Sequence, residues 1–204
     1  MIMHKGSWTR LYNQNMTQEL YISVDVETAG PIPGRNALLS IGACLVEDTG
    51  NTFYVELQPD QDEFIPEAMA VSGLSAGALK KTGTPPGAAL LAFETWVNNV
   101  VPPGFRPVFV AFNAPFDWMF IQDYFIRYLG HNPFGHSALD IKAYYMGQTG
   151  GSWAETSMTH VSTHLLEERH LSHNALNDAQ DQAEIFHMLL QRARTPGGFL
   201  DEIG

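Results

Sequence analysis

Residues 21–30 read YISVDVETAG. The side chains of this stretch alternate, with apolar Ile22, Val24 and Val26 between polar Ser23, Asp25 and Glu27. A period of two predicts a β-strand whose apolar face packs on a core. The other face then carries Asp25 and Glu27. They are either solvated acids on a half-buried strand or part of a metal site whose other ligands come from elsewhere in the chain.

The length of 204 residues suits one domain of α/β or α+β type with a substantial core. We predict a loose N-terminal extension over residues 1–19 and a single domain over residues 20–204. The extension carries a Lys and an Arg but lacks the apolar segment of a secretory signal. No apolar run approaches the roughly 20 residues of a membrane helix. We therefore expect a soluble, cytoplasmic protein without a membrane partner.

The charge and the cysteine content argue against two classes of function. A formal net charge of -11 disfavours a protein that coats long duplexes, because such binding needs clustered Lys and Arg. A nuclease remains compatible, since carboxylates that hold divalent cations create a far less negative local field. The single Cys44 lies in an apolar run. We expect it to be buried, which makes it a poor nucleophile for a hydrolase that pairs it with His and Asp.

Further strands and helices are indicated by the pattern of apolar residues and breakers. Two strands over residues 37–48 and 51–59, joined at residues 49–51, complete an opening three-strand meander. Short helices broken at Gly73, Gly77 and Gly83 are expected next. The remaining expected elements are a helix over 87–101, a strand over 106–113, a helix from 114 to about 128, and helices over 138–147, 158–169 and 175–194.

Partners for Asp25 and Glu27 should be acids at the ends of regular elements, because a metal site needs a rigid scaffold. Asp117 follows the predicted fourth strand at the start of a helix, and Asp178 lies in the first turns of the final helix. Asp178 also stands one position before the core-facing Ala179, at the edge of the buried stripe. The simpler explanation for either acid is that the helix dipole favours it there.

His173 stands five residues before Asp178, in the loop just ahead of the final helix. Its ordinary pKa of about 6.5 lets a His take a proton near neutral pH, although a surface or capping role is the alternative. Asp181 lies one turn beyond Asp178, but the five-residue step from His173 favours Asp178. Asp140 is interpreted as the N-cap of the helix that follows it. Four other histidines are interpreted as surface or structural residues: His160, His164, His170 and His187.

Three blocks of the sequence resemble the signature motifs of the DEDDh 3′-5′ exonucleases of the ribonuclease H-like superfamily. They are Asp25-x-Glu27-Thr28, Asn113-Ala114-Pro115-Phe116-Asp117 and His173-x4-Asp178, in this order. The resemblance covers about residues 20–194 and is strongest to ribonuclease T and the proofreading exonuclease subunits. It implies an α/β, ribonuclease H-like fold, with a central mixed sheet of about five strands flanked by helices.

The resemblance also implies the chemistry of the site. Asp25, Glu27, Asp117 and Asp178 would bind two divalent cations, Mg²⁺ or Mn²⁺, which prefer such hard oxygen ligands. His173 would act as the general base on the attacking water. The enzyme would then hydrolyse phosphodiester bonds from the 3′ end of single-stranded or short RNA or DNA and release nucleoside 5′-monophosphates.

Four further residues are implied as substrate contacts. Thr28 and Ala29 would offer backbone groups to the terminal nucleotide, and Phe116 would stack on a base near the 3′ end. Asn113 would contact the substrate, and the alternative for it is that it only fixes the loop at the end of the fourth strand. Plain core packing is the alternative for Phe116.

A catalytically inactive domain of this fold, binding nucleic acid or a protein, is the rival interpretation. All five motif residues are present, whereas a decayed copy would usually lack one or more. Two departures from the family pattern bear on substrate binding: Phe112 stands where many relatives have His, and Asn174 stands where Arg or Ser is common. A homodimer is expected from the same resemblance, because the charge of -11 leaves a monomer little basic surface.

Overall fold

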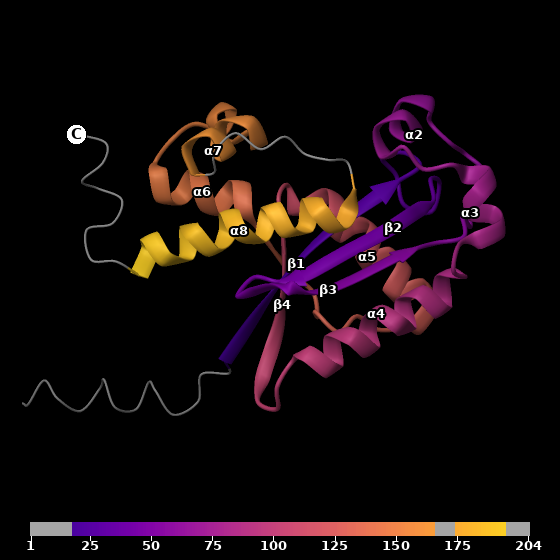
Figure 1. Ribbon diagram of the computed structural model, residues 1–204, viewed down its shortest axis with the longest axis horizontal. Helices are drawn as coiled ribbons and strands as arrows, with labels where there is room; N and C mark the ends of the chain where they lie inside the picture. The colour runs from indigo at the N-terminus through magenta and orange to yellow at the C-terminus, as the bar shows by residue number, and fades with distance from the viewer. Residues whose placement is uncertain (1–17, 166–173, 195–204) are drawn as a thin grey trace, which may run out of the picture.

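The computed structural model describes residues 18–165 and 174–194, which contain a mixed five-stranded sheet (Figure 1). The strands are β1 (Gln18–Thr28), β2 (Leu38–Leu45), β3 (Asp48–Glu56), β4 (Phe105–Ala111) and β5 (Ala138–Asp140), in the spatial order β3-β2-β1-β4-β5. β1, β2 and β3 form an antiparallel meander, and β4 and β5 continue the sheet in parallel with β1. The expected meander and mixed sheet are confirmed.

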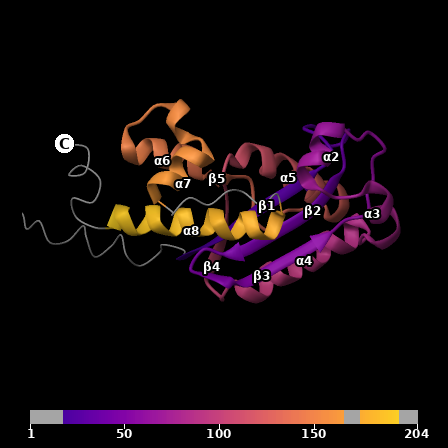
Figure 2. The ribbon, with the colours of Figure 1, turned by 45° about the horizontal axis from the view of Figure 1, so that its top comes forward.

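The helices are α2 (Pro66–Ser72), α3 (Ala76–Thr82), α4 (Pro86–Val100), α5 (Ala114–Leu129), α6 (Ile141–Thr149), the short 3-10 helix η1 (Trp153–Thr156), α7 (Met158–Leu165) and α8 (Ala175–Arg194). Helices α2 to α5 lie between strands along the chain, and α6, η1, α7 and α8 follow the last strand. α8 crosses one face of the sheet, whereas α4 and α5 lie on the other side (Figure 2). No helix within the described ranges combines the length and the apolar character that a membrane span requires.

The larger core lies between the sheet and helices α4 and α5. Ile22, Val24 and Val26 of β1 are buried there, as the alternation in the sequence predicts. Phe93 of α4 and Phe125 of α5 pack against each other beneath them, with ring centroids 5.9 Å apart. Burying each such side chain stabilises the fold by about 1.5–3 kcal/mol, so this layer fixes β1 from behind.

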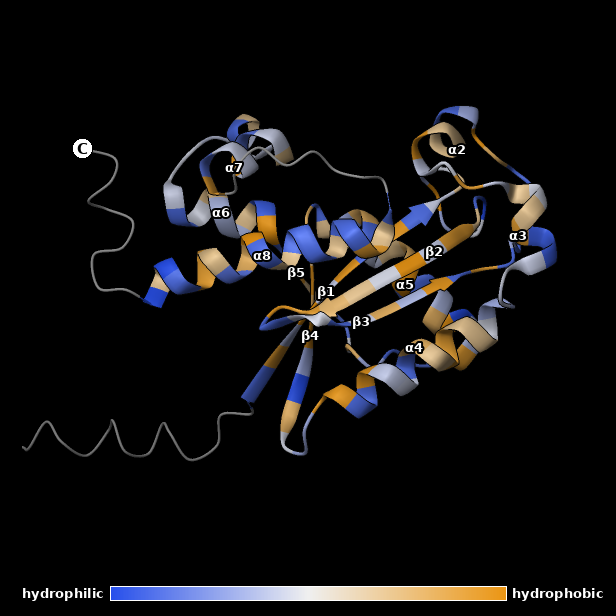
Figure 3. Ribbon diagram, in the orientation of Figure 1, coloured by the Kyte–Doolittle hydropathy of each residue, from blue (hydrophilic) through white to orange (hydrophobic). Residues whose placement is uncertain are grey.

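The second core lies between the sheet and α8. Tyr21 of β1 packs edge-on against Phe186 of α8, with ring centroids 5.3 Å apart. Cys44 and Val46 from the β2–β3 hairpin are buried in the same layer. β2 is hydrophobic along most of its length, whereas α8 also carries many hydrophilic residues (Figure 3). The buried stripe of α8 nevertheless includes two polar residues, Asp178 and Gln182.

The turn expected at residues 49–51 is wrong, because the chain turns earlier, at residues 46–47, and β3 begins at Asp48. Val46 explains the difference. Its side chain is buried in the α8 layer, and its N–H donates to the carbonyl oxygen of Tyr21 at 3.1 Å. Burial of Val46 therefore fixes the turn at residues 46–47. Residues 49–51, where the turn was expected, become part of β3.

Smaller differences occur at Gly77 and at β5. Gly77 does not break a helix but lies in the first turn of α3, whose N-cap is Ser75. A single Gly costs a helix only about 0.5–1 kcal/mol relative to Ala, so Gly77 by itself does not end one. Residues 138–140, which were expected to begin a helix over 138–147, form the short strand β5 instead, and α6 starts at Ile141. A strand of three residues is too short to produce a recognisable pattern. β1 begins at Gln18, two residues inside the predicted extension, and residues 1–17 lie outside the described ones.

The first turn of α8 lies directly on Gly42 of β2. A Cβ atom at Gly42 would come within 2.2 Å of the carbonyl carbon of Ala175 and within 2.3 Å of the backbone nitrogen of Leu176. Gly42 pairs with Asp25 across the β1–β2 ladder. Only glycine permits this approach of backbone to backbone, and it brings the start of α8 over the acidic face of β1.

Gly42→Ala is expected to lower the free energy of unfolding by about 1–3 kcal/mol, because the added methyl group overpacks the contact. Gly87→Ala is the matched control, since a Cβ at Gly87 in α4 would meet the side chain of Tyr128 at an ordinary 3.8 Å. The control should be neutral or gain up to roughly 1 kcal/mol. Urea unfolding of both variants measures the difference. Equal stability of the two would show that α8 does not depend on Gly42.

Candidate active site

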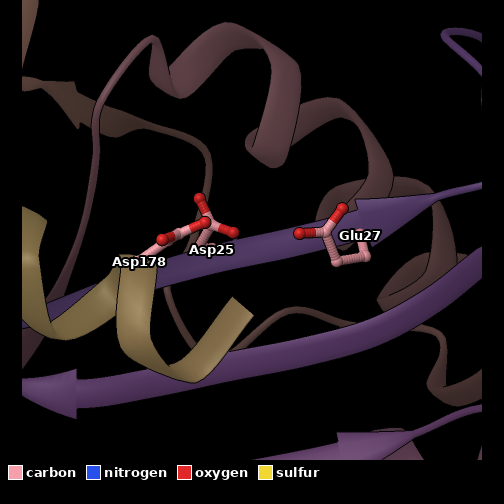
Figure 4. Close-up of side chains that lie close together, drawn as sticks. All are labelled: Asp25, Glu27 and Asp178. Atoms are coloured by element: carbon pink, nitrogen blue, oxygen red, sulfur yellow. The ribbon is translucent and has the colours of Figure 1, made fainter. Parts of the chain in front are cut away.

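Three carboxylates meet where β1 passes beneath the first turn of α8. Asp25 and Glu27 extend from the same face of β1, and Asp178 extends from α8 towards Asp25 (Figure 4). One oxygen from each of the three lies within 4.8 Å of the others. Asp178 is 4% exposed, and the two strand acids are partly buried. The sequence-predicted acids Asp25, Glu27 and Asp178 are therefore brought together.

Asp117 joins this group from the start of α5. It is 4% exposed, and its Oδ1 accepts a hydrogen bond from the backbone N–H of Val26 at 3.1 Å. The ladder between β1 and β4 ends at Ser23 and Val110, so this N–H lies beyond the paired residues. Asp117 takes the place of a strand partner there, between the positions of Asp25 and Glu27.

The electrostatics of the group are unfavourable without a counter-charge. Burial, followed by repulsion from the neighbouring carboxylates, raises the pKa of Asp25 well above its usual range. Burial and the nearby Asp178 raise the pKa of Glu27 to about 7. Burial raises the pKa of Asp117 to about 8, although the Val26 hydrogen bond opposes the shift. Acids in this state are suited to divalent cations, which remove the repulsion and prefer carboxylate oxygens.

The loop from β4 to α5 is fixed at both of its ends. Asn113 has φ 67° and ψ 45°, in the left-handed region, which Asn tolerates better than most residues. The next N–H, that of Ala114, donates to Oδ1 of Asp140 at 3.0 Å. Oδ2 of Asp140 accepts from the N–H of Ala143 at 3.1 Å and caps α6, as the sequence predicted. Asp140 therefore holds the start of the helix that carries Asp117.

A cavity of about 290 Å³ opens beside Glu27. Its lining residues come from the end of β1, from α2 and from α5: Val26, Glu27, Thr28, Glu67, Ala68, Val71 and Phe116. Phe116 also packs on the core, with its ring centroid 5.6 Å from that of Phe120. The two interpretations of Phe116, core packing and exposure to a ligand, are thus compatible.

Thr28 and Ala29 differ in what they offer this cavity. Thr28 lines it, although its hydroxyl donates to the carbonyl oxygen of Gly30 at 2.9 Å. Ala29 is fully buried, its N–H donates to Ala37 and its carbonyl accepts from Ile65, both at 2.8 Å. A backbone contact to a nucleotide is therefore easier from Thr28 than from Ala29. The side chain of Asn113 is exposed at the start of α5.

His173 lies outside the described residues. Asn174 directly follows it and begins α8, since its side-chain oxygen accepts from the N–H groups of Leu176 and Asn177 at 3.2 and 3.3 Å. Its carbonyl oxygen accepts from the N–H of Asp178 at 2.9 Å. The departure from the family pattern at Asn174 thus provides a helix cap, which fixes the turn that carries Asp178.

The remaining sequence-based alternatives are resolved by burial and contacts. Cys44 is fully buried, and burial raises the pKa of its thiol to about 12, so it is not a reactive nucleophile. His160 and His164 stack on each other one turn apart on α7, with ring centroids 4.3 Å apart. Nδ1 of His187, on α8, lies 3.3 Å from Oε2 of Glu47. His170 falls outside the described residues.

Gln182 is a site residue that no sequence motif indicated. Its Nε2 donates to Oδ1 of Asp25 at 2.6 Å, and its Oε1 accepts from the N–H of Phe112 at 2.9 Å. Gln182 is four residues after Asp178, so both side chains extend from the same side of α8. A polar residue inside the buried stripe of a helix was the signal that could have identified it.

Comparisons with known proteins identify the family to which the chain belongs. Residues 20–190 match the Rv2179c-like domain family, described as a 3′-5′ exoribonuclease domain. The 3′-5′ DNA exonuclease Cap18 of Escherichia coli is 46% identical over 172 residues, which cover 84% of this chain and 92% of the relative. Ribonuclease T of Baumannia cicadellinicola subsp. Homalodisca coagulata is 28% identical over 189 residues, which cover 87% and 86%.

The solved structures give the same fold. The nuclease domain of 3′hExo, a DEDDh family member bound to rAMP, superposes with a TM-score of 0.68 at 14% identity, covering 87% of this chain and 94% of that one. The ribonuclease H-like fold expected from the sequence is confirmed. By the family match and the relative at 46% identity, the chain belongs to the family of Rv2179c-like 3′-5′ exoribonuclease domains and is a 3′-5′ exonuclease of the DEDDh group.

Proposed function

We propose that this exonuclease removes nucleotides one at a time from the 3′ end of single-stranded or short nucleic acid and releases nucleoside 5′-monophosphates. The observation that carries the proposal is the gathering of Asp25, Glu27 and Asp178 within 4.8 Å beside a cavity of about 290 Å³. The acids provide a cation site, and the neighbouring cavity has room for the terminal nucleotide. A duplex end would need to separate before one strand could enter it.

We infer that Asp25, Glu27, Asp117 and Asp178 hold two divalent cations, Mg²⁺ or Mn²⁺. DEDDh exonucleases depend on metal, and the donor set here consists of carboxylate oxygens alone, which suits these hard ions. When bound, the cations offset the negative charge of the phosphodiester and of its transition state. The raised pKa values of Glu27 and Asp117 support the proposal, because they express the repulsion that cations remove.

The proton transfer is assigned to His173, which precedes Asp178 by five residues in the sequence. Its imidazole would accept the proton of the attacking water, since a neutral His is the usual general base near neutral pH. Asn174 would then connect this base to the ligand Asp178, because it caps the same helical turn.

The terminal nucleotide is assigned to the cavity beside Glu27. Phe116 would stack on a base, and Thr28 would contribute a backbone contact. We assign Ala29 a steric role as the buried floor behind Thr28, because its own backbone groups are already bonded within the protein. Asn113 would contact the substrate from the exposed loop that leads into α5.

DNA is the proposed preferred substrate, because the relative at 46% identity is named a DNA exonuclease. RNA remains the alternative, since the family is described by exoribonuclease activity. A catalytically inactive binding domain is disfavoured. Carboxylates that repel one another destabilise the fold, and a domain that binds no cation would gain nothing to offset this cost. Trimming of matched DNA and RNA oligonucleotides with Mg²⁺ or Mn²⁺ distinguishes these outcomes.

A homodimer and a cytoplasmic location remain predictions. Four described cations already contact carboxylates, which supports the view that one chain offers little free basic surface: Arg35, Lys80, Arg106 and Arg127. A second copy would enlarge the surface available to nucleic acid. Sedimentation velocity measures the oligomeric state directly, and a monomer at working concentration would contradict the prediction.

Asp178→Asn should reduce trimming of a 5′-labelled single-stranded oligonucleotide by about 10²- to 10⁴-fold, since several kcal/mol of charge stabilisation are lost. Trimming by His173→Ala should fall by a similar factor, because this variant lacks the general base. The control is Asp181→Asn, three residues along α8 from Asp178 and outside the acidic group. It should trim like the wild type. Unchanged activity of Asp178→Asn, or release of the 5′ label as a mononucleotide before any ladder forms, would contradict the assignment.

The stability of the metal-free protein should fall as pH rises. Glu27 and Asp117, with pKa values of about 7 and about 8, keep protons in the folded state that the unfolded chain has already released. The free energy of unfolding therefore decreases from about pH 4 to about pH 8, because over this range the folded state binds more protons than the unfolded state.

Melting temperatures in EDTA at about pH 5.5 and about pH 8 measure this loss of stability. Mn²⁺ should raise the melting temperature more at the higher pH, because metal binding requires ionised carboxylates. Asp117→Asn should flatten the metal-free dependence and be more stable than the wild type at about pH 8. A metal-free wild type that gains stability over this range would refute the account.

Phe116→Leu should raise KM for a single-stranded oligonucleotide by about 5- to 150-fold, the equivalent of the roughly 1–3 kcal/mol of one stacked base. Leucine keeps an apolar side chain against the core, so kcat and the melting temperature should change little. Met119→Leu, one turn along α5, is the control and should keep the wild-type KM. If KM is the same in all three proteins, Phe116 serves packing alone.

A further inference from the structure

Gln182 is a buried amide whose position no motif explains. It is 2% exposed and lies in the middle of α8, among residues that pack on the sheet. A buried polar side chain is costly unless its donors and acceptors are bonded. Gln182 meets this requirement through two contacts, one to Asp25 and one to Phe112.

These two contacts determine which way the amide faces. The partner at Phe112 is a backbone N–H, which can only donate, so the atom 2.9 Å from it is the oxygen Oε1. The NH₂ group must then face Asp25, where Nε2 lies 2.6 Å from Oδ1. A flipped amide would set donor against donor at Phe112 and acceptor against acceptor at Asp25. The orientation is therefore unique.

The bond to Phe112 anchors Gln182 to the most constrained part of the site. Phe112 is the first residue after β4, and Asn113 follows it in the left-handed conformation. α5 starts at the next residue and carries Asp117 in its first turn. Gln182 therefore links three parts of the acidic group: its own helix with Asp178, the strand acid Asp25, and the loop that positions Asp117.

The bond to Asp25 restricts how that carboxylate can turn. With Oδ1 held by the amide N–H, Asp25 keeps Oδ2 and the free lone pair of Oδ1 for other ligands. Asp117 is held in the same manner, because its Oδ1 accepts from the N–H of Val26. Each of the two acids thus has one oxygen fixed by an N–H donor. Hydrogen bonds of this kind orient metal ligands, and losing one typically costs 10- to 100-fold in metal affinity or activity.

We propose that Gln182 is a positioning residue that holds the Asp25 carboxylate in the orientation required for binding divalent cations and couples it to the β4–α5 loop. This inference depends on the proposed function, since it concerns the same cation site. Gln182 does not belong to the residues that line the cavity beside Glu27. Its loss should therefore change metal binding, whereas KM for the oligonucleotide at saturating metal should stay near the wild-type value.

Gln182→Met tests the proposal, because Met has a similar length and cannot make either hydrogen bond. Calorimetric titration of the metal-free protein with Mn²⁺ should give an affinity 10- to 100-fold weaker than that of the wild type. The Mn²⁺ concentration for half-maximal trimming should rise by a similar factor. Gln180→Met is the matched control, because Gln180 bonds the carbonyl oxygen of Thr49 at 2.8 Å, away from the acids. It should keep the wild-type affinity.

Gln182→Glu separates positioning from mere support of the fold. It keeps an acceptor for the N–H of Phe112 but presents a second acceptor to Asp25 in place of the donor. At mildly alkaline pH it should keep a folded circular dichroism spectrum and still lose at least 10-fold in trimming at saturating Mn²⁺. This variant also serves if Gln182→Met does not fold.

The outcomes for the two proposals are distinct. A wild-type protein that binds no Mn²⁺ and trims nothing would overturn the proposed cation site itself. A wild type that binds Mn²⁺, together with folded Gln182 variants of unchanged affinity and unchanged trimming, would overturn only the role of Gln182. Weaker binding in Gln180→Met and Gln182→Met alike would also overturn it, because the effect would then not depend on the contact with Asp25.

Discussion

The contact between the first turn of α8 and Gly42 is the constraint on which the site depends. Backbone lies against backbone there, with no room for a Cβ atom, and Asp25 lies directly across the ladder from Gly42. The start of α8 is consequently held over the acidic face of β1, which brings Asp178 to Asp25. The two cores act together in this, since α4 and α5 support β1 from behind while α8 packs on its front.

The carboxylates proposed to bind cations also lower the stability of the metal-free protein. Carboxylates whose pKa values are raised by burial and mutual repulsion destabilise the metal-free protein at neutral and alkaline pH. The fold tolerates them because N–H donors hold one oxygen each of Asp25 and Asp117. These two carboxylates are therefore oriented before any cation arrives, so they should rearrange little when metal binds.

Much of the fold could be predicted from local patterns, and the exceptions have physical causes. The alternation in β1 and the apolar stripe of α8 were sufficient because each element has one face in a core. The β2–β3 turn was misplaced because the burial of Val46 depends on α8, which lies far along the chain. The acids of the site were identifiable from the order of three motifs. Gln182 was not, since its role arises only when α8, β1 and the residue after β4 meet in space.

We propose that the gathered carboxylates hold the catalytic cations. Crystals grown with Mn²⁺ and a non-hydrolysable single-stranded oligonucleotide test it most directly, because anomalous scattering locates manganese without reference to activity. The account predicts manganese in contact with Asp25, Glu27, Asp117 and Asp178, and the 3′-terminal base against Phe116. Manganese bound elsewhere, with these four carboxylates free of metal in a protein that still trims DNA, would contradict it.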